Sequence, residues 1–352
     1  MSKEPRLTLA QIEAMRPGAR TAVRTCMGVR AQDRVFVLTD RVTSAIGRLI
    51  SEEAADAGAQ TIVGELEQFG LRPMTEFQSN LRGELRAFSP TVTFYAASSQ
   101  PGELPFRMQL RVFLLEELKV RHAHMPGVTQ QLMLEGMRAD YKIVAALTRA
   151  VYDLGRETRT IEVTTPDGTN LIAKISPDLR WVPSTGIYHE QGQWGNLPEG
   201  ESFTCPETLD GVLVAHVLGD YFSEKYGVLE QPVIFHLSDG RVTAVECARA
   251  DIALEITDYL DSSENGRRAG EFAIGTNIGL KRLTGNLLQD EKLPGIHVAF
   301  GNPYPHETGA DWTSSVHVDV IPVQCTIVMD GQTVMQDGRF NYDLLGVSPS
   351  GR

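Results

Sequence analysis

The sequence predicts an α/β protein with two domains: a Rossmann-like parallel-sheet domain over residues 1–155, and a mixed, β-rich domain over residues 156–352. A chain of 352 residues is longer than one ordinary hydrophobic core supports. Helical and strand-like patterns alternate up to about Gly155, which is typical of a parallel sheet with helices on its faces. Beyond Gly155, short alternating strands and Gly/Pro turns dominate, and they indicate a second domain of different architecture.

The elements of the first domain follow from hydrophobic periodicity. Leu9, Ile12 and Val23 lie at broadly helical spacing and predict a first helix, and the short apolar run Val35–Leu38 predicts a buried strand. The predicted helices cover residues 8–27, 43–57, 105–118 and 129–153, and the predicted strands cover residues 35–38, 61–63, 91–97 and 120–124.

The loop after the first strand argues against a nucleotide site. It reads Thr39-Asp40-Arg41-Val42 and contains neither a GxGxxG nor a GxxxxGK[ST] motif. A carboxylate at Asp40 would repel a phosphate rather than bind it. We therefore expect a Rossmann-like domain without a nucleotide cofactor.

The second domain begins with a predicted β-hairpin. Residues 158–163 and 171–175 alternate as strands around the turn Pro166-Asp167-Gly168. Strand-like segments continue to the C-terminus, and one helix is predicted over residues 248–262.

Composition limits the partners. The formal net charge is −12, which disfavours nucleic acid and anionic lipid as partners because both need a basic surface. No segment approaches the roughly 20 apolar residues of a membrane span, and the first residues lack the apolar core of a signal peptide. The cysteines form no CxxC pair, so we expect buried free thiols and a cytoplasmic location; they are Cys26, Cys205, Cys247 and Cys325.

The clearest chemical signal lies in the strand-like segment Ser314–Ile321. His317 and Asp319 are two residues apart and would share one strand face, with valines on the other. Burying such a polar pair without a partner is costly, so a bound cation would account for it. The alternative is a strand with one face in solvent.

Three further segments repeat this pattern. His297 and Ala299 would share a face of Ile296–Gly301, where the small residue leaves room for an ion, although a core histidine is the alternative. Glu271 stands at the start of an apolar strand, and an acidic residue there could equally mark the solvent-exposed end of the strand. Glu201 follows a Pro- and Gly-containing turn that could present it in a fixed direction.

Together these four segments resemble the thermophilic aminopeptidase T family of metallopeptidases, the M29 aminopeptidases. The family pattern is an N-L-P-x-G-E turn, a G-E-x-A strand, an H-x-A-x-G strand and an S-S-x-H-x-D strand, in that order. Here the four motifs stand at Asn196–Glu201, Gly270–Ala273, His297–Gly301 and Ser314–Asp319. The α/β first half also fits the domain plan of the family.

The resemblance implies a metal-binding second domain with two divalent ions, zinc, cobalt or manganese. Its ligands would be Glu201, Glu271, His297, His317 and Asp319, with Glu201 as our candidate for the bridging carboxylate. Such centres activate a water molecule that attacks the scissile carbonyl. The candidate catalytic residues are Tyr304, which could hydrogen-bond the oxyanion or merely pack in a proline turn, and Glu201. The resemblance also implies a homodimer.

The predicted function is a metal-dependent aminopeptidase or a small-amide hydrolase whose substrate carries a free amino group. The link Asn302–Val316 is shorter than in the family, which leaves the substrate class open. The alternative is a mononuclear Fe(II) ring-cleaving dioxygenase related to dihydroxypyridine dioxygenase, because two histidines and Asp319 would satisfy its ligand types. That relative carries a histidine near the position of Glu271, so Glu201 and Glu271 favour hydrolysis. We expect a structural role for His122 and His124 in the first domain.

Overall fold

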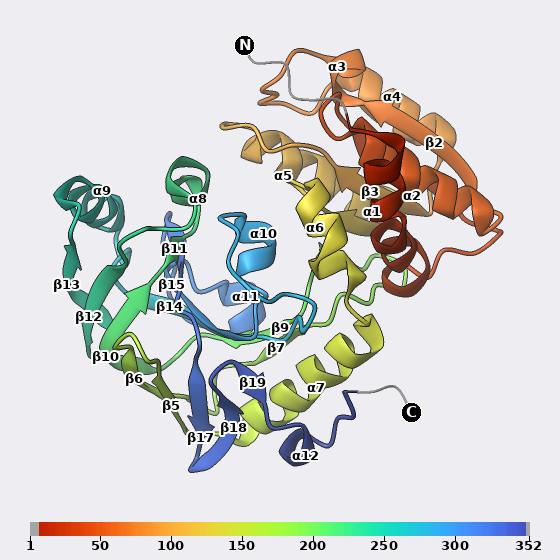
Figure 1. The fold of residues 1–352 in the computed structure, drawn as a ribbon. Helices are drawn as coiled ribbons and strands as arrows, with labels where there is room; N and C mark the ends of the chain where they lie inside the picture. Colours follow the sequence, from red (N-terminus) through yellow and green to blue (C-terminus); the bar gives the residue numbers. More distant parts are fainter. Residues whose placement is uncertain (1–6, 350–352) are drawn as a thin grey trace. The chain divides into compact units, whose positions relative to one another are not determined.

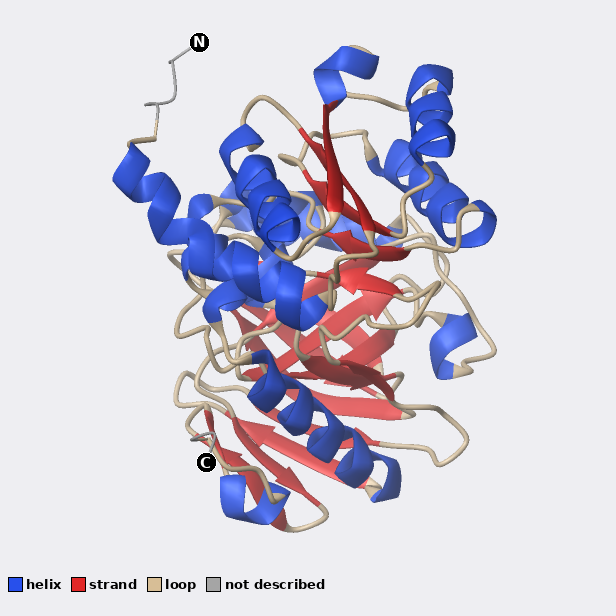
Figure 2. Ribbon diagram, turned by 90° about the vertical axis from the view of Figure 1, so that its right-hand side faces the viewer, coloured by secondary structure: helices blue, strands red, loops and turns tan. Residues whose placement is uncertain are grey.

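The computed structural model describes residues 7–349, and the chain divides into two compact units (Figure 1). One unit contains Met1–Lys142 and Gly186–Glu199, and the other contains Ile143–Thr185 and Gly200–Arg352. The predicted mixed α/β class is confirmed, because helices surround a parallel sheet in the first unit and antiparallel sheets form most of the second (Figure 2).

The first unit contains a parallel sheet in the strand order β2-β1-β3-β4-β8. Its strands are β1 (Arg34–Thr39), β2 (Gln60–Glu65), β3 (Val92–Ala96), β4 (Arg121–His124) and β8 (Trp194–Asn196). Its helices are α1 (Leu9–Arg20), α2 (Ser44–Asp56), α3 (Leu66–Phe69), α4 (Ser79–Phe88), α5 (Leu104–Val112) and α6 (Gln130–Leu134), with π-helical turns at Thr21–Cys26 and Phe113–Glu117 and a 3₁₀ turn at Gly136–Arg138. Alternate side chains of β1 and β3, such as Phe36 and Tyr95, join side chains of α4 and α5, such as Leu85 and Phe106, in one apolar cluster.

The predicted single helix over residues 129–153 is wrong. The structure has α6, the 3₁₀ turn and then α7 (Tyr141–Glu157). The backbone leaves helical geometry at Glu135 and is extended at Ala139. Asp140 Oδ1 then accepts a hydrogen bond from the backbone N–H of Lys142 at 3.0 Å at the start of the new helix. The other predicted elements of this unit occur, and α3, α4 and β8 are additional.

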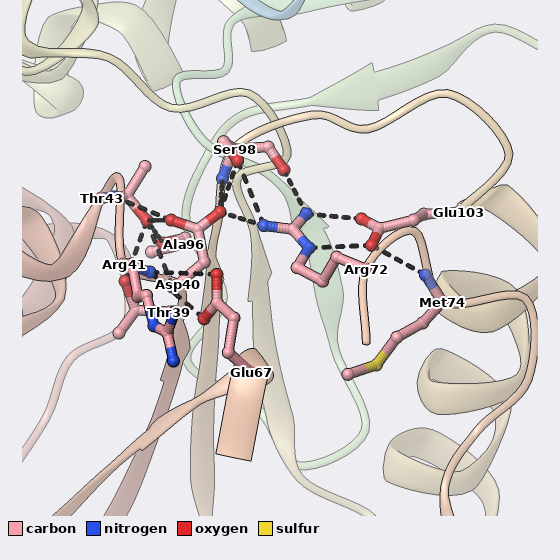
Figure 3. A network of polar contacts seen from close by, with 10 residues as sticks. All are labelled: Thr39, Asp40, Arg41, Thr43, Glu67, Arg72, Met74, Ala96, Ser98 and Glu103. Carbon is pink, nitrogen blue, oxygen red and sulfur yellow. Dashed lines mark hydrogen bonds and ion pairs between the residues drawn. The ribbon is translucent and has the colours of Figure 1, made fainter. Parts of the chain in front are cut away.

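The carboxyl ends of β1 and β3 are joined by a buried polar network (Figure 3). Asp40 accepts hydrogen bonds from the backbone N–H groups of Thr43 and Ser98, both at 2.8 Å, and from the guanidinium of Arg72. Arg72 also donates to Glu103, with Nε 2.8 Å from Oε1. In open α/β sheets this edge is where ligands commonly bind. Here an internal ion-pair network joins the two strand ends, so Asp40 has a structural role.

The second unit contains two sheets with antiparallel pairing. The eight-stranded sheet has the order β13-β12-β10-β6-β5-β17-β18-β19, with β5 (Thr160–Thr164), β6 (Asn170–Lys174), β10 (Thr208–Ala215), β12 (Val233–Ser238), β13 (Arg241–Cys247), β17 (Thr326–Met329), β18 (Gln332–Gln336) and β19 (Arg339–Phe340). The six-stranded sheet has the order β11-β16-β15-β14-β9-β7, with β7 (Val182–Ser184), β9 (Glu201–Thr204), β11 (Val217–Leu218), β14 (Ala269–Gly275), β15 (Gly295–Gly301) and β16 (His317–Ile321). The helices besides α7 are α8 (Tyr221–Tyr226), α9 (Ala250–Asp261), α10 (Leu287–Asp290), α11 (Pro305–Thr308) and α12 (Tyr342–Leu345).

The two sheets share one apolar core. Phe235 of β12 and Phe300 of β15 lie with ring centroids 5.2 Å apart, and Val298 and Val318 belong to the same cluster. The predicted hairpin, as β5 and β6, and the predicted helix, as α9, are both confirmed. One face of the six-stranded sheet therefore packs in the core, and its opposite face presents the residues of interest.

Candidate metal centre

All five predicted ligands lie on one face of the six-stranded sheet. Glu201 starts β9, Glu271 lies on β14, His297 lies on β15, and His317 and Asp319 lie on β16. Their neighbours along each strand, including Phe272, Val298 and Val318, point into the apolar core. The alternation predicted for these strands therefore places the polar side chains together.

Small residues make room between the ligands. Glu271 and Asp319 both pair with Ala299, and His297 pairs with Ala273. The partners of the other two ligands are glycines: Glu201 pairs with Gly275 of β14, and His317 pairs with Gly301 of β15. Since directly opposite side chains are the nearest neighbours in a sheet, Ala and Gly at these positions leave space for an ion.

The imidazoles and carboxylates converge within a few ångströms. His297 Nε2 lies 3.3 Å from Glu271 Oε1, 3.7 Å from Glu201 Oε2 and 3.8 Å from Asp319 Oδ1. His317 Nε2 lies 3.7 Å from Glu271 Oε2 and 3.6 Å from Asp319 Oδ1. These side chains form two groups that could each hold a metal ion. One group is Glu201, Glu271 and His297, and the other is Glu271, His317 and Asp319. The ligand atoms of each group lie within 4.8 Å of one another.

Backbone hydrogen bonds orient both histidines. His297 Nδ1 lies 2.9 Å from the carbonyl oxygen of Glu291, and His317 Nδ1 lies 2.9 Å from that of Asn302. A carbonyl can only accept, so Nδ1 carries the proton and Nε2 faces the carboxylates. Metal-binding histidines are commonly oriented in this way.

The donor set fits divalent cations. Glu201 Oε2 is buried and has no hydrogen-bond partner among residues 7–349, although it points toward His297. A buried carboxylate oxygen without a partner is costly, and a cation would satisfy it. Carboxylate oxygens and imidazole nitrogens are ligands that zinc and related metals accept.

Without a metal, protons balance the charge of the carboxylates. Burial alone would lower the pKa of His297, but the hydrogen bond with Glu271 and the charge of Glu201 outweigh burial and raise this pKa to about 9. Burial also opposes protonation of His317, yet the charge of Asp319 raises its pKa to about 10. Burial would raise the pKa of Asp319, and the charge of His317 overcomes it and lowers the pKa to about 2.

Tyr304 lies at the edge of this centre. Its hydroxyl is 3.4 Å from His317 Nε2, the two rings lie 4.7 Å apart, and Phe203 packs edge-on against the tyrosine ring. Burial of the hydroxyl, followed by the charges of Glu271 and Asp319, raises the pKa of Tyr304 well above its ordinary value. The tyrosine is therefore a neutral donor beside the candidate ligands. The side chains of the neighbouring His306 and Glu307 are exposed.

Two charged residues at the centre were not predicted from the sequence. The ammonium of Lys292 lies 2.7 Å from Glu201 Oε1 and 2.9 Å from Glu291 Oε1, and its side chain is 3% exposed. These two residues, Lys292 and Glu291, directly follow α10. They belong to the charged run Asp290-Glu291-Lys292, which in a sequence is typical of an exposed turn. The one available signal is that this charged run immediately precedes the strand of His297.

The other candidate residues belong to neither of these two ligand groups. His122 and His124 are on β4 of the first unit, with Nε2 of His122 3.3 Å from Nδ1 of His124, and burial lowers the pKa of His122 to about 3. Three of the cysteines are buried and Cys247 is partly buried, and all four are free thiols. Within residues 7–349, every helix is too short or too polar to span a bilayer.

The fold is shared with two solved structures. The chain is similar to wild-type AmpT from Thermus thermophilus, with a TM-score of 0.67 and 18% identity over 94% of this chain and 99% of that one. It is also similar to 2,5-dihydroxypyridine dioxygenase from Pseudomonas putida KT2440, with a TM-score of 0.65 and 17% identity over 95% of this chain and 98% of that one. At such identities the likeness shows a common fold, which hosts different chemistries.

The family is shown by sequence. No curated protein matches the chain. The model of the family described as thermophilic metalloprotease (M29) matches residues 131–340, which is more than half of the chain and includes all five candidate ligands. The chain therefore belongs to the thermophilic metalloprotease (M29) family.

Proposed function

We propose that this protein is a two-metal aminopeptidase, or a small-amide hydrolase with the same centre. Membership of a metalloprotease family makes it a metal-dependent hydrolase. The observation that carries the proposal is the position of Glu271, which belongs to both candidate ligand groups. Its Oε1 faces His297 and its Oε2 faces His317. One carboxylate shared between two ions is the usual arrangement of a two-metal hydrolase.

The two half-sites divide the ligands. Glu201, Glu271 and His297 would hold one ion, and Glu271, His317 and Asp319 would hold the other, with zinc, cobalt or manganese as the candidate metals. The geometry favours Glu271 over Glu201 as the shared ligand, because only Glu271 is common to both groups. When bound, such ions polarise the scissile carbonyl and supply an activated water molecule.

The chain's own residues would complete the reaction. The neutral hydroxyl of Tyr304 is placed to donate a hydrogen bond to the oxyanion that forms at the scissile carbonyl. Glu201 is our candidate catalytic residue as a metal ligand, because its Oε2 is buried, points toward the centre and has no hydrogen-bond partner within residues 7–349. The free amino group of a peptide or small amide substrate would be recognised at the same centre, as its neutral amine. A homodimer and a cytoplasmic location stay predictions.

A second candidate function is ring cleavage by a single iron(II). Both imidazole Nε2 atoms approach the same oxygen of Asp319, at 3.8 Å and 3.6 Å, so two histidines and one carboxylate converge. Glu201 and Glu271 argue against it, because such a site needs one carboxylate and this centre has three.

The test combines metal content with two assays. We expect two zinc-like ions per chain by elemental analysis, and hydrolysis of leucine p-nitroanilide but not of its N-acetylated form. Glu201→Gln and His317→Ala should each abolish this hydrolysis while circular dichroism shows a folded protein. One iron per chain together with oxygen uptake on 2,5-dihydroxypyridine would instead support the dioxygenase, and normal hydrolysis by either variant would reject the site.

A further inference from the structure

We propose that Lys292 makes the two half-sites unequal, so that the ion held by Glu201, Glu271 and His297 binds more weakly and exchanges more readily than its neighbour. This inference rests on the proposed function. It concerns how tightly the protein binds each of its metal ions. It also gives a role to the buried ammonium of Lys292, which is not one of the five proposed ligands.

The two oxygens of Glu201 have different surroundings. Oε1 lies 2.7 Å from the ammonium of Lys292, whereas Oε2 lacks a hydrogen-bond partner within residues 7–349 and lies 3.7 Å from His297 Nε2. The ammonium therefore occupies one oxygen and leaves the other for a metal. Glu201 would then offer one oxygen to an ion, whereas Glu271 faces His297 and His317 with different oxygens and is the better candidate for the shared carboxylate.

The lysine is fixed where it stands. Its backbone N–H donates to the carbonyl of Gln289 at 3.0 Å, and its own carbonyl accepts from Asn277 N at 3.0 Å. The backbone of residue 292 packs closely on β14, since a Cβ added to Gly275 would lie 2.8 Å from the carbonyl carbon of Lys292. With a side chain 3% exposed, the ammonium has no open route into solvent.

A fixed positive charge acts unequally on the two halves. Lys292 is in hydrogen-bond contact with a ligand of the first half. Glu201 belongs only to the first ligand group, because the second group consists of Glu271, His317 and Asp319. Two like charges repel more strongly at short distance and in a buried site. The charge of Lys292 therefore weakens the binding of a divalent ion beside Glu201 more than the binding of an ion beside Asp319.

Calorimetric titration of the metal-free protein with Zn²⁺ tests this inequality. The wild-type protein should bind two ions in two steps whose affinities differ by about tenfold or more. Lys292→Gln removes the charge but keeps a hydrogen-bond donor, and it should tighten the weaker step by about tenfold or more while leaving the tighter step within about threefold. Lys292→Arg should keep the wild-type pattern. The matched control is Lys174→Gln, which makes the same charge change on an exposed strand position and should alter neither step.

Single-ligand variants assign each step in the otherwise wild-type chain, so the test does not depend on the folding of a Lys292 variant. His297→Ala should leave only the tight step, and His317→Ala should leave only the weak one. Two steps of equal affinity, or a weaker step that Lys292→Gln leaves unchanged or loosens, would overturn the role of Lys292. A wild-type protein that binds no metal at these residues would refute the proposed function itself.

Discussion

The carboxylates around the two histidines of the centre raise the pKa values of both imidazoles, and this has a consequence for stability. The pKa values of His297 and His317 are raised to about 9 and about 10 from an ordinary value of 6.5. A group whose pKa is higher in the folded state stabilises the fold fully below its unfolded pKa, and this stabilisation is lost as pH rises through the folded pKa.

The metal-free protein should therefore become less stable between about pH 6.5 and pH 10. Thermal unfolding measured across this range should show a falling midpoint. Excess Zn²⁺ should remove most of the fall, because the metal then balances the carboxylates in place of protons. In His317→Ala the fall should be smaller. A metal-free midpoint that rises over this range would contradict the charge arrangement of the centre.

Tyr304 offers a prediction that separates chemistry from metal binding. Removing one donor to an oxyanion typically costs on the order of 10²–10³ in kcat. Tyr304→Phe keeps the ring beside His317 and loses only the hydroxyl, so kcat should fall by about this factor. Metal content and KM should stay near the wild-type values. If kcat is unchanged, the tyrosine only packs in its proline turn.

At the level of strands, the pairing of β15 with β16 sets the positions of three ligands. Gly301 has φ +102°, and a Cβ there would lie 2.1 Å from the carbonyl oxygen of Val316. A side chain would thus require strained backbone and would push apart the strands that carry His297, His317 and Asp319. Close β-pairing at this glycine is a condition for the centre.

Gly301→Ala should lower the free energy of unfolding by about 2 kcal/mol or more and weaken metal binding. The matched control is Gly83→Ala in α4, where an added Cβ meets nothing within 4 Å. That change should stabilise the protein by roughly 0.5–1 kcal/mol, because alanine suits a helix interior better than glycine. Chemical denaturation of both variants gives the comparison. Equal effects would mean that the β15–β16 approach is not tight.

The site strands were predictable because period-two alternation is a local property. The sequence around His297 and His317 showed which side chains share a face, and the register then brought the faces together. The break in the helix before Tyr141 was not predictable, because apolar spacing continues through Ala139 although the backbone becomes extended there. Lys292 escaped prediction for a related reason: only the tertiary fold buries a charged turn.

Across the whole molecule, the two units have different polar interiors. The second unit concentrates acidic and imidazole groups that call for a cation, whereas the first balances its buried carboxylates internally. Arg72, Asp40 and Glu103 are 7%, 0% and 1% exposed as side chains and form two ion pairs (Figure 3). The sequence indicated that Asp40 is unsuited to phosphate. Two of its partners, Arg72 and Ser98, lie 32 and 58 residues away in the chain and could not be found from local pattern.

Arg72→Met should destabilise the protein by roughly 3–5 kcal/mol, because it leaves two buried carboxylates without their cation. The metal affinity of the centre should be unchanged, since its ligands belong to the second unit. Arg86→Met, which removes an arginine that is 56% exposed and paired with Glu117, should change stability by less than about 0.5 kcal/mol. Equal, small effects of the two variants would show that the buried network contributes little.

The central claim is that five side chains of one sheet face hold two metal ions. Anomalous X-ray diffraction at the zinc edge, on crystals of the protein loaded with Zn²⁺, tests it most directly. We expect two peaks roughly 3.5–4 Å apart, both within bonding distance of Glu271, with one beside His297 and the other beside His317. Peaks located away from these residues, or no peak in crystals of fully loaded protein, would contradict it.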